Sequence, residues 1–329
     1  MGKATSLLVL SAIAAFLILK RGKKSTPPAP LTSEPPTPEP EPPTPEPPTP
    51  APPTPEPPPP TTTLNTPYGV AVDSTGNVYV TDINNDSIDR VRKIDTTGKV
   101  TNLGEEADPP FSNPYSVAVD DKGNVYVADT YNRLVRKIDA KTGAVTNLGE
   151  QANPKFSSPR GVAVDSTGNV YVADNGNNLV RKIDAKTGAV TNLGETANPK
   201  FGNPFGVAVD SAGNVYVADT YNSLVRKIDA KTGAVTNLGE KANSPFVGPS
   251  GVAVDSIGNV YVADFDNNLV RKIDAKTGAV TNLGETANPK FSHPSGVAVD
   301  VEGNVYVADL SNGLMRKIDG KTGIVTTVK

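Results

Sequence analysis

The sequence contains no cysteine, no tryptophan and a single histidine, and aromatic residues make up only 5% of its 329 residues. Without cysteine, this chain has no disulfide bond, no thiolate nucleophile and no cysteine-ligated metal site. With His293 as the sole imidazole, neither a multi-histidine metal site nor a pair of catalytic histidines can form. The net charge of −3 lacks the basic excess typical of nucleic-acid-binding proteins, so we expect no nucleic-acid partner.

Proline, in contrast, is abundant and unevenly placed. Of the 32 prolines, 20 lie between Pro27 and Pro60, within a Pro/Thr/Glu-rich stretch that covers residues 25–63. Such a stretch cannot bury apolar surface, and its prolines favour extended polyproline II conformations. We interpret residues 25–63 as a disordered linker that acts as a spacer. A ligand for an SH3-type domain is the alternative, because P-x-x-P spacing occurs.

The segment before this linker has the pattern of a membrane anchor. Residues 4–19 are apolar or small and are followed by four basic residues between Lys20 and Lys24. At 1.5 Å per residue they reach about 24 Å, slightly less than the ~30 Å core of a bilayer. We interpret residues 1–24 as an uncleaved transmembrane helix with a basic flank. A cleaved secretory signal is the alternative, since Ala12-Ile13-Ala14 resembles a cleavage site.

Two further expectations concern the membrane. The basic flank places the C-terminal part on the cytoplasmic side of a single-pass protein by the positive-inside rule. An extracytoplasmic or virion-surface position is the alternative, because long proline-rich spacers also carry domains away from a membrane. Gly2 lies in the acceptor pattern for N-myristoylation, a short pattern that also occurs by chance.

From Leu64 to Lys329 the chain repeats one unit six times. The sequence Val-Ala-Val-Asp recurs with a first spacing of 47 residues and then spacings of 45, ending at Asp73, Asp120, Asp165, Asp210, Asp255 and Asp300. Each unit holds four strand-like runs separated by glycine-containing turns, which in the second unit are residues 116–120, 124–129, 134–138 and 144–148. Units of about 40–50 residues with four antiparallel strands are typical of propellers. We predict an all-β fold, a six-bladed β-propeller with four antiparallel strands per blade, over residues 64–329.

The units resemble the NHL repeat. The motifs P-x-G-V-A-V-D, G-N-V-Y-V-A-D and N-x-L-V-R-K-I-D recur, and Asn132-Arg133-Leu134 matches the short element that gives the repeat its name. The first unit departs from the pattern at Asn84–Ile88, where it carries extra residues. The resemblance implies the propeller fold. It does not imply one function, because a fold hosts many.

The count of strands also predicts how the ring closes. Alignment backward from Asp73 leaves no seventh outer strand before the first unit, whereas residues 324–328 supply the sixth unit with a fourth strand of its own. We therefore expect blade six to pack directly on blade one without strand exchange. Pairing of Thr61–Thr63 into the last blade would contradict this expectation.

Residues that recur in every unit are explained as parts of the blade. We expect the aspartates equivalent to Asp120 and Asp129 to accept backbone N–H bonds in turns and to pair with cations of the Arg136-Lys137 type. A calcium array and a basic nucleic-acid surface are the alternatives. Tyr126 and its counterparts alternate with valines and are predicted to lie in the core. We expect neither a metal site nor a cofactor.

Function is expected where the units differ, on the face opened by the loops between strands 2 and 3 and between strand 4 and the next strand 1. The predicted binding residues there are Tyr68, Tyr115, Tyr131, Arg160, Phe205, Tyr221, Phe265 and Asp266. Aromatic side chains accompanied by an arginine are typical of protein interfaces. Unselected variation of exposed loops is the alternative. His293 is interpreted as one more loop substitution.

These observations favour a membrane-tethered, non-enzymatic binding module that presents its variable loops to a protein or peptide partner. A carbohydrate partner is left open. The first alternative is a structural, membrane-associated component of a virion or cell envelope. The second is a metal-dependent lyase or hydrolase, because resemblance to enzymatic propellers implies metal ligands contributed by different blades.

Overall fold

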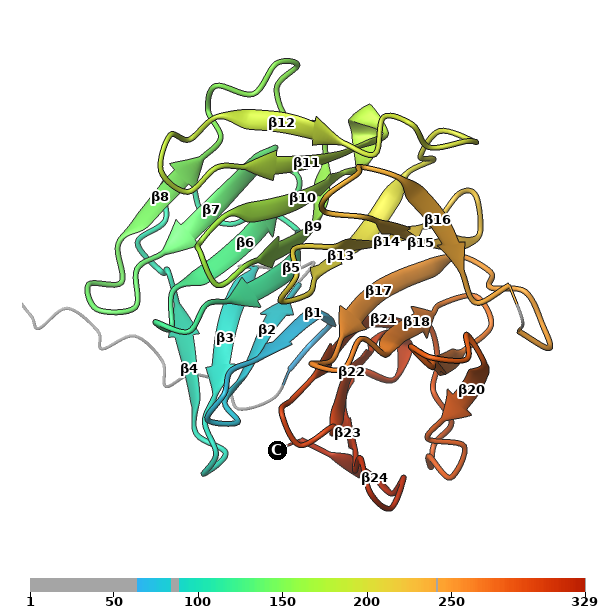
Figure 1. Ribbon diagram of the computed structural model, residues 1–329. Helices are drawn as coiled ribbons and strands as arrows, with labels where there is room; N and C mark the ends of the chain where they lie inside the picture. The colour runs from blue at the N-terminus through green and yellow to red at the C-terminus, as the bar shows by residue number, and fades with distance from the viewer. Residues whose placement is uncertain (1–63, 84–88, 241, 329) are drawn as a thin grey trace, which may run out of the picture. The chain divides into compact units, whose positions relative to one another are not determined.

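Six four-stranded antiparallel sheets make up the folded part of the chain. The computed structural model describes residues 64–83, 89–240 and 242–328. Within them the strands of each sheet follow one another in sequence order, and every sheet is built from one repeat unit. Figure 1 shows the sheets around a common axis, with the first strand of each near the centre and the fourth strand outermost. This arrangement confirms the predicted six-bladed propeller.

The elements of the six blades have the following bounds. Blades one to three contain β1 (Pro67–Val72), β2 (Val78–Asp82), β3 (Arg90–Ile94) and β4 (Val100–Leu103); β5 (Pro114–Val119), β6 (Val125–Asp129), β7 (Leu134–Ile138) and β8 (Val145–Leu148); and β9 (Pro159–Val164), β10 (Val170–Asp174), β11 (Leu179–Ile183) and β12 (Val190–Leu193). Blades four to six contain β13 (Pro204–Val209), β14 (Val215–Asp219), β15 (Leu224–Ile228) and β16 (Val235–Leu238); β17 (Pro249–Val254), β18 (Val260–Asp264), β19 (Leu269–Ile273) and β20 (Val280–Leu283); and β21 (Pro294–Val299), β22 (Val305–Asp309), β23 (Leu314–Ile318) and β24 (Val325–Thr327). Two short 3-10 helices follow β10 and β22, namely η1 (Asn175–Asn177) and η2 (Leu310–Asn312).

The aspartate at the end of each first strand closes the turn to the second, as predicted. In blade two, Asp120 Oδ1 accepts the backbone N–H groups of Lys122 at 3.0 Å and Asn124 at 2.8 Å. Its Oδ2 accepts the Tyr126 hydroxyl at 3.1 Å. Tyr126 is itself only 4% exposed, which confirms that this tyrosine belongs to the core. Because Asp120 serves the turn, β5 ends one residue earlier than the sequence suggested.

The hydrophobic core lies between neighbouring blades. Tyr126, Ala128 and Val135 of blade two, for example, pack against Phe156 and Val162 of blade three. At the last junction, Tyr306 and Met315 of blade six pack against residues of blade one, among them Val70 and Val80. The sheet of blade six consists of β21–β24 alone. Closure without strand exchange is therefore confirmed for the described residues, and Thr61–Thr63 lie outside them.

The first strands approach one another so closely that most of them need glycine. A Cβ atom on Gly206 would lie 2.3 Å from the Ser250 carbonyl oxygen of the next blade. Gly161 is confined in the same way, with 2.3 Å to the Phe205 carbonyl oxygen. Blade two carries Ser116 instead, and its hydroxyl oxygen accepts the Val162 N–H at 3.2 Å. The channel at the centre of the ring is correspondingly narrow.

A buried ion pair recurs in every blade. In blade two, Arg136 and Asp129 are joined at 3.0 Å, and neither side chain is more than 1% exposed. The remaining carboxylate positions accept the Ser112 N–H at 2.8 Å and the Asn132 side-chain amide at 2.9 Å. The Arg136 guanidinium also lies 5.3 Å from the centre of the Phe111 ring. The predicted pairing of repeated aspartates with arginines is confirmed for the Asp129 type. Asp120 instead bonds groups of its own turn and the Tyr126 hydroxyl, and no ion pair joins it to another described residue.

Several sequence predictions concern other parts of the chain. The membrane anchor of residues 4–19, Gly2, the linker of residues 25–63 and the irregular segment of residues 84–88 lie outside the described residues. Among the residues that are described, no helix has the length and apolar character needed to cross a bilayer.

Replacement of one arginine of a buried pair tests how much the blade depends on it. Arg136→Met leaves Asp129 buried without its cation, which we expect to lower the free energy of unfolding by about 3–5 kcal/mol. Urea denaturation measures this difference. Arg133→Met, at an exposed position in the same blade, is the control and should change stability by less than about 0.5 kcal/mol. Equal stability of the two variants would contradict the role assigned to the pair.

Candidate functional site

The loops lie on two opposite faces of the propeller, as the sequence predicted. On one face, the Tyr131 N–H donates to the Ser112 carbonyl at 3.1 Å and joins the loop between strands 2 and 3 to the loop before strand 1. On the other, the Ala140 N–H donates to Asn124 Oδ1 at 3.1 Å and joins the remaining two kinds of loop. We call the first the variable face and the second the repeat face.

Four of the predicted binding residues meet at the end of the central channel. Tyr68, Tyr115, Arg160 and Phe205 are the second residues of β1, β5, β9 and β13, and we call them the mouth cluster. The rings of Tyr68 and Tyr115 are 4.3 Å apart in an edge-on arrangement, and Phe205 lies 5.9 Å from each of them. The Arg160 guanidinium is 5.0 Å from the centre of the Tyr115 ring and 4.8 Å from that of Phe205.

Blades five and six contribute small residues at the same position. Ser250 and Ser295 are 3% and 2% exposed. The Ser250 hydroxyl donates to the Ser295 carbonyl at 2.6 Å, and the Ser295 hydroxyl donates to the Tyr68 carbonyl at 2.8 Å. Large side chains from four successive blades thus share the channel end with two serines that are bonded to the backbone.

The cavity within the channel is too small for an ordinary ligand. It measures about 80 Å³ and is lined by the first strands of all six blades. At about 30 Å³ per molecule it holds two or three waters, whereas small-molecule sites usually measure roughly 300–1,000 Å³. A ligand of that size therefore does not fit within the channel.

Burial changes the acidity of the two tyrosines in the cluster. The pKa of Tyr68 is raised above its ordinary value of 10.0, chiefly by burial and then by the neighbouring Tyr115. Burial also raises the pKa of Tyr115, an effect that the positive charge of Arg160 opposes. Tyr131 contributes to both shifts and so lies beside the cluster, although its own side chain is 64% exposed. Both clustered phenols remain neutral hydrogen-bonding groups at physiological pH.

The other predicted residues stand apart from the cluster. Tyr221 is 80% exposed and lies against Gly202. Phe265 packs on the His293 ring at 4.8 Å, and Asp266 is exposed beside it. Within the described parts of the chain, no ring contact or ion pair joins Tyr221, Phe265 or Asp266 to the mouth cluster. The predicted binding residues thus do not form a continuous ring. Four of them form the mouth cluster with Tyr131 beside it, and Tyr221, Phe265 and Asp266 lie separately on the loops.

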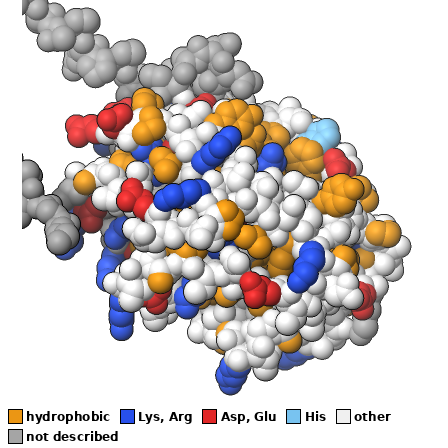
Figure 2. Space-filling model, turned by 90° about the horizontal axis from the view of Figure 1, so that it is seen from above, with side chains coloured by type: hydrophobic (Ala, Val, Ile, Leu, Met, Phe, Trp, Pro, Cys, Tyr) orange, Lys and Arg blue, Asp and Glu red, His pale blue; other side chains and the backbone are white. Residues whose placement is uncertain are grey.

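His293 has a local structural setting. Its Nδ1 lies 3.0 Å from the Ser311 hydroxyl, and its backbone N–H donates to Asn268 Oδ1 at 2.8 Å. These bonds connect the loop before β21 to loops of its own blade and of the preceding blade. Figure 2 shows hydrophobic side chains beside the single histidine, with acidic and basic side chains scattered over the face in view.

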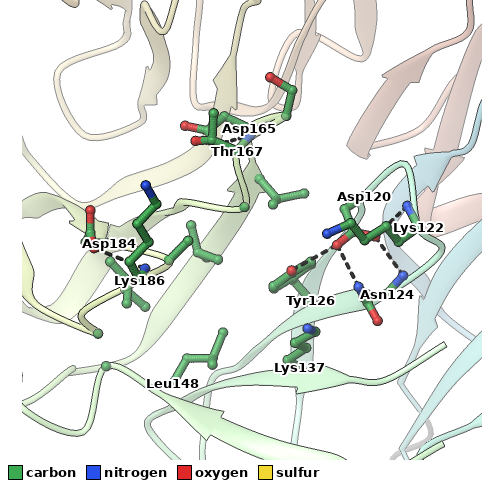
Figure 3. A pocket seen from close by; sticks show the side chains of 18 of the residues that line it. Asp120, Lys122, Asn124, Tyr126, Lys137, Leu148, Asp165, Thr167, Asp184 and Lys186 are labelled. Carbon is green, nitrogen blue, oxygen red and sulfur yellow. Dashed lines mark hydrogen bonds between the residues drawn. The ribbon is translucent and has the colours of Figure 1, made fainter. Parts of the chain in front are cut away.

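Sequence reasoning missed four grooves that lie between neighbouring blades on the repeat face and are larger than the cavity in the channel. The groove between blades two and three has a volume of about 660 Å³, and those at three other junctions measure about 480, 500 and 430 Å³. Figure 3 shows Asp120, Tyr126 and Lys137 on one side of the first groove and Asp184 on the other. The available signal was that Asp recurs in both kinds of loop on this face and Lys recurs in the loop between strands 3 and 4, but residues that recur in every unit are also explained as parts of the blade.

Three of the carboxylates that line this groove, those of Asp120, Asp165 and Asp184, already close turns of the fold. Asp120 is bonded within its turn, and Asp184 Oδ1 accepts the backbone N–H groups of Lys186 and Thr187 at 3.1 and 2.9 Å. Hydrogen bonds from Thr187 hold the pKa of Asp184 below its ordinary value of 3.8. Across residues 64–83, 89–240 and 242–328, no group of three or more His, Asp or Glu side chains is placed to hold a metal ion.

Comparison with known proteins agrees with this architecture. The NHL repeat family matches five segments, residues 111–138, 156–183, 201–228, 246–273 and 291–318. These segments begin at the phenylalanine of each loop before strand 1 and end with the third strand. No curated protein sequence matches the chain.

Similar solved structures have diverse functions. Virginiamycin B lyase from Staphylococcus aureus is 17% identical with a TM-score of 0.58, over 80% of this chain and 84% of that one. An auxiliary nutrient binding protein from Bacteroides ovatus is 16% identical with a TM-score of 0.60, over 81% and 70%. A chain of the nidogen/laminin complex is 15% identical with a TM-score of 0.58, over 78% and 90%. At these identities the similarity shows the fold alone.

Packing of the mouth cluster can be tested by removing its most buried ring. Phe205 is 8% exposed, so Phe205→Ala should lower the free energy of unfolding by about 3–5 kcal/mol through lost burial and the cavity left behind. Chemical denaturation provides the measurement. Tyr221→Ala removes an exposed ring from the same face and should cost less than about 0.5 kcal/mol. A change for Phe205→Ala as small as the control's would mean that the cluster is not packed.

Proposed function

Because the chain belongs to the NHL-repeat family, whose fold is compatible with enzymes and binding proteins alike, we propose a function from its unrepeated residues. The protein is a membrane-tethered, non-catalytic binding module, and its variable face recognises a protein or peptide partner.

The mouth cluster is the observation that carries this proposal. Near-identical repeats place Tyr68, Tyr115, Arg160 and Phe205 at equivalent positions. The six blades thus carry two tyrosines, an arginine, a phenylalanine and two serines where the surrounding motif is otherwise repeated. They join four blades through ring and cation–π contacts. Tyrosine and arginine are enriched among the residues that dominate binding energy at protein interfaces. The cluster supplies such anchors on a rigid scaffold.

Exposed residues around the cluster provide additional contact area. Tyr131 and Tyr221 are 64% and 80% exposed, and Val247 on the same face is 42% exposed. Tyrosine offers a large contact area at low entropic cost, because its side chain has few rotatable bonds. A partner that covers the cluster can also bury these side chains.

Two features support a non-catalytic role. The mouth cluster lies at the end of the channel, and the cavity that it helps to line has room for only about two or three waters. His293 packs on Phe265 and bonds Ser311, so its ring contributes to loop structure. Neither the cavity in the channel nor the surroundings of His293 form a concave site in which a substrate and a general base would meet.

The proposed tether is residues 4–19, with the basic flank directing the propeller to the cytoplasmic side. Residues 25–63 could span up to about 120 Å when fully extended, at ~3.1 Å per residue. Such a spacer allows the binding face to reach partners well away from the bilayer. Both segments lie outside the described residues.

Partner capture by the full chain tests the proposed surface. A variant in which alanine replaces Tyr115, Tyr131 and Phe205 should show about a tenfold or greater reduction in specific capture of protein partners, because aromatic anchors dominate such interfaces. Quantitative mass spectrometry of captured proteins provides the readout. Since Phe205 is buried, a second variant that changes only the exposed Tyr131 and Tyr221 to alanine separates binding from folding, and it should show a partial loss.

The repeat face provides the matched control. Ile257 and Val301 are 75% and 81% exposed in turns between first and second strands. A variant with both replaced by alanine should capture partners as the unchanged protein does. Full capture by both variants of the variable face would place the binding site elsewhere.

The non-catalytic proposal also makes a prediction about metal ions. We expect Ca²⁺, Mg²⁺, Mn²⁺ or Zn²⁺ at about 1 mM, and likewise EDTA, to shift the melting temperature by less than about 1 °C in scanning fluorimetry. An ion present at 100 times its dissociation constant would stabilise the fold by about 2.7 kcal/mol, equivalent to several degrees. A shift of that size, lost when EDTA is added, would instead favour a metal-dependent enzyme.

A further inference from the structure

Arg160 differs from the arginines that build the blades. Each strand-three arginine is buried and paired with an aspartate at 2.9–3.1 Å. Arg160, in contrast, lies in the mouth cluster, and none of the described carboxylates is within ion-pairing distance of it. Its contacts are with the faces of Tyr115 and Phe205, at 5.0 and 4.8 Å from the ring centres.

The two ends of the guanidinium group have different surroundings. Nε is buried and has no hydrogen-bond partner. The two terminal nitrogens are not buried in this way, and no described residue accepts a hydrogen bond from them. Arg160 is half-buried as a whole, so the edge that carries these nitrogens keeps some contact with solvent, while the rings of Tyr115 and Phe205 restrict how the group can rotate. An arginine held in this manner is a preorganised donor pair without an acceptor.

We propose that Arg160 binds a carboxylate of the peptide partner. A guanidinium donates two parallel N–H···O bonds to a carboxylate, which adds geometric specificity to the charge attraction. Prior restriction by the two rings reduces the entropy lost on binding. The mouth cluster contains one arginine rather than the cluster of cations typical of phosphate sites, so a carboxylate is the better match. The tyrosines beside it provide contact area for apolar neighbours of that carboxylate.

This inference rests on the proposed function, because it names the chemistry that the variable face recognises. The carboxylate has two sources in a peptide, an Asp or Glu side chain and the C-terminus. Each source makes the same pair of hydrogen bonds with Arg160, and the experiment below distinguishes them.

The test uses the purified full chain and two arrays of random octapeptides, one with amidated C-termini and one with free C-terminal carboxylates. Bound peptides on the amidated array should be enriched in Asp or Glu next to apolar residues if the side chain is recognised. Binding confined to the free-acid array would identify the C-terminus. For a selected peptide, conversion of the carboxylate to its amide should weaken binding about tenfold or more, as measured by fluorescence anisotropy.

Variants assign the effect to one residue. Arg160→Gln should lose about tenfold or more in affinity for the selected peptides, and Arg160→Lys should show an intermediate loss because it keeps the charge without the planar pair of donors. Arg133→Gln, another arginine on the variable face, is the control and should bind normally. The carboxylate-to-amide comparison needs no protein variant, so it holds even if Arg160→Gln folds poorly.

Failure of this inference can be told from failure of the proposed function. One outcome would overturn the carboxylate assignment and leave the binding surface intact. In that outcome, the selected peptides lack carboxylates and bind Arg160→Gln normally, but they lose binding when Tyr115, Tyr131 and Phe205 become alanine. If no bound peptide depends on any residue of the mouth cluster or on Tyr131, both the carboxylate assignment and the peptide-binding surface are wrong.

Discussion

The buried pair between the last residue of each second strand and the middle residue of each third strand supports the rest of the structure. Two charges removed from water are costly unless their remaining polar atoms are bonded. Asp129 is bonded to Ser112 and Asn132, and Arg136 donates to the Pro109 carbonyl at 2.7 Å. These bonds join the sheet to the loop that arrives from the preceding blade. The pair therefore fixes where each first strand begins.

That constraint positions the mouth cluster. The first strands begin at the variable face and run so close together that glycine is required beside the axis in most blades. At the glycine position itself the next strand leaves no space for a side chain. The residue just before it, closer to the variable face, can carry a large one. Six such positions converge on one channel, and four are occupied by Tyr68, Tyr115, Arg160 and Phe205. Their close packing follows from the narrow ring, and so does the enclosure of Arg160 between two rings.

The two faces of the propeller illustrate the limits of reasoning from repeats. Asp120 and Asp129 recur because they build turns and ion pairs, and both roles were predictable from residue type and position. The same reasoning set aside the repeat face, although its grooves are larger than the cavity in the channel. Tyr221, Phe265 and Asp266 belong to the predicted face, yet they stand apart from the cluster. Sequence position identifies the loop of a residue but not its distance from the loops of other blades.

The sequence by itself determined the number of blades, the four strands of each, the direct closure of blade six on blade one, and the division of the loops between two faces. These features depend on local periodicity, turn residues and the count of units, which are properties of the chain. Only the tertiary structure decided that Tyr68, Tyr115, Arg160 and Phe205 form one packed cluster, that Ser250 and Ser295 complete it, and that Arg160 has no carboxylate partner among the described residues. Those contacts join residues about 45 positions or more apart, so they exist only once the ring has closed and set the width of its channel.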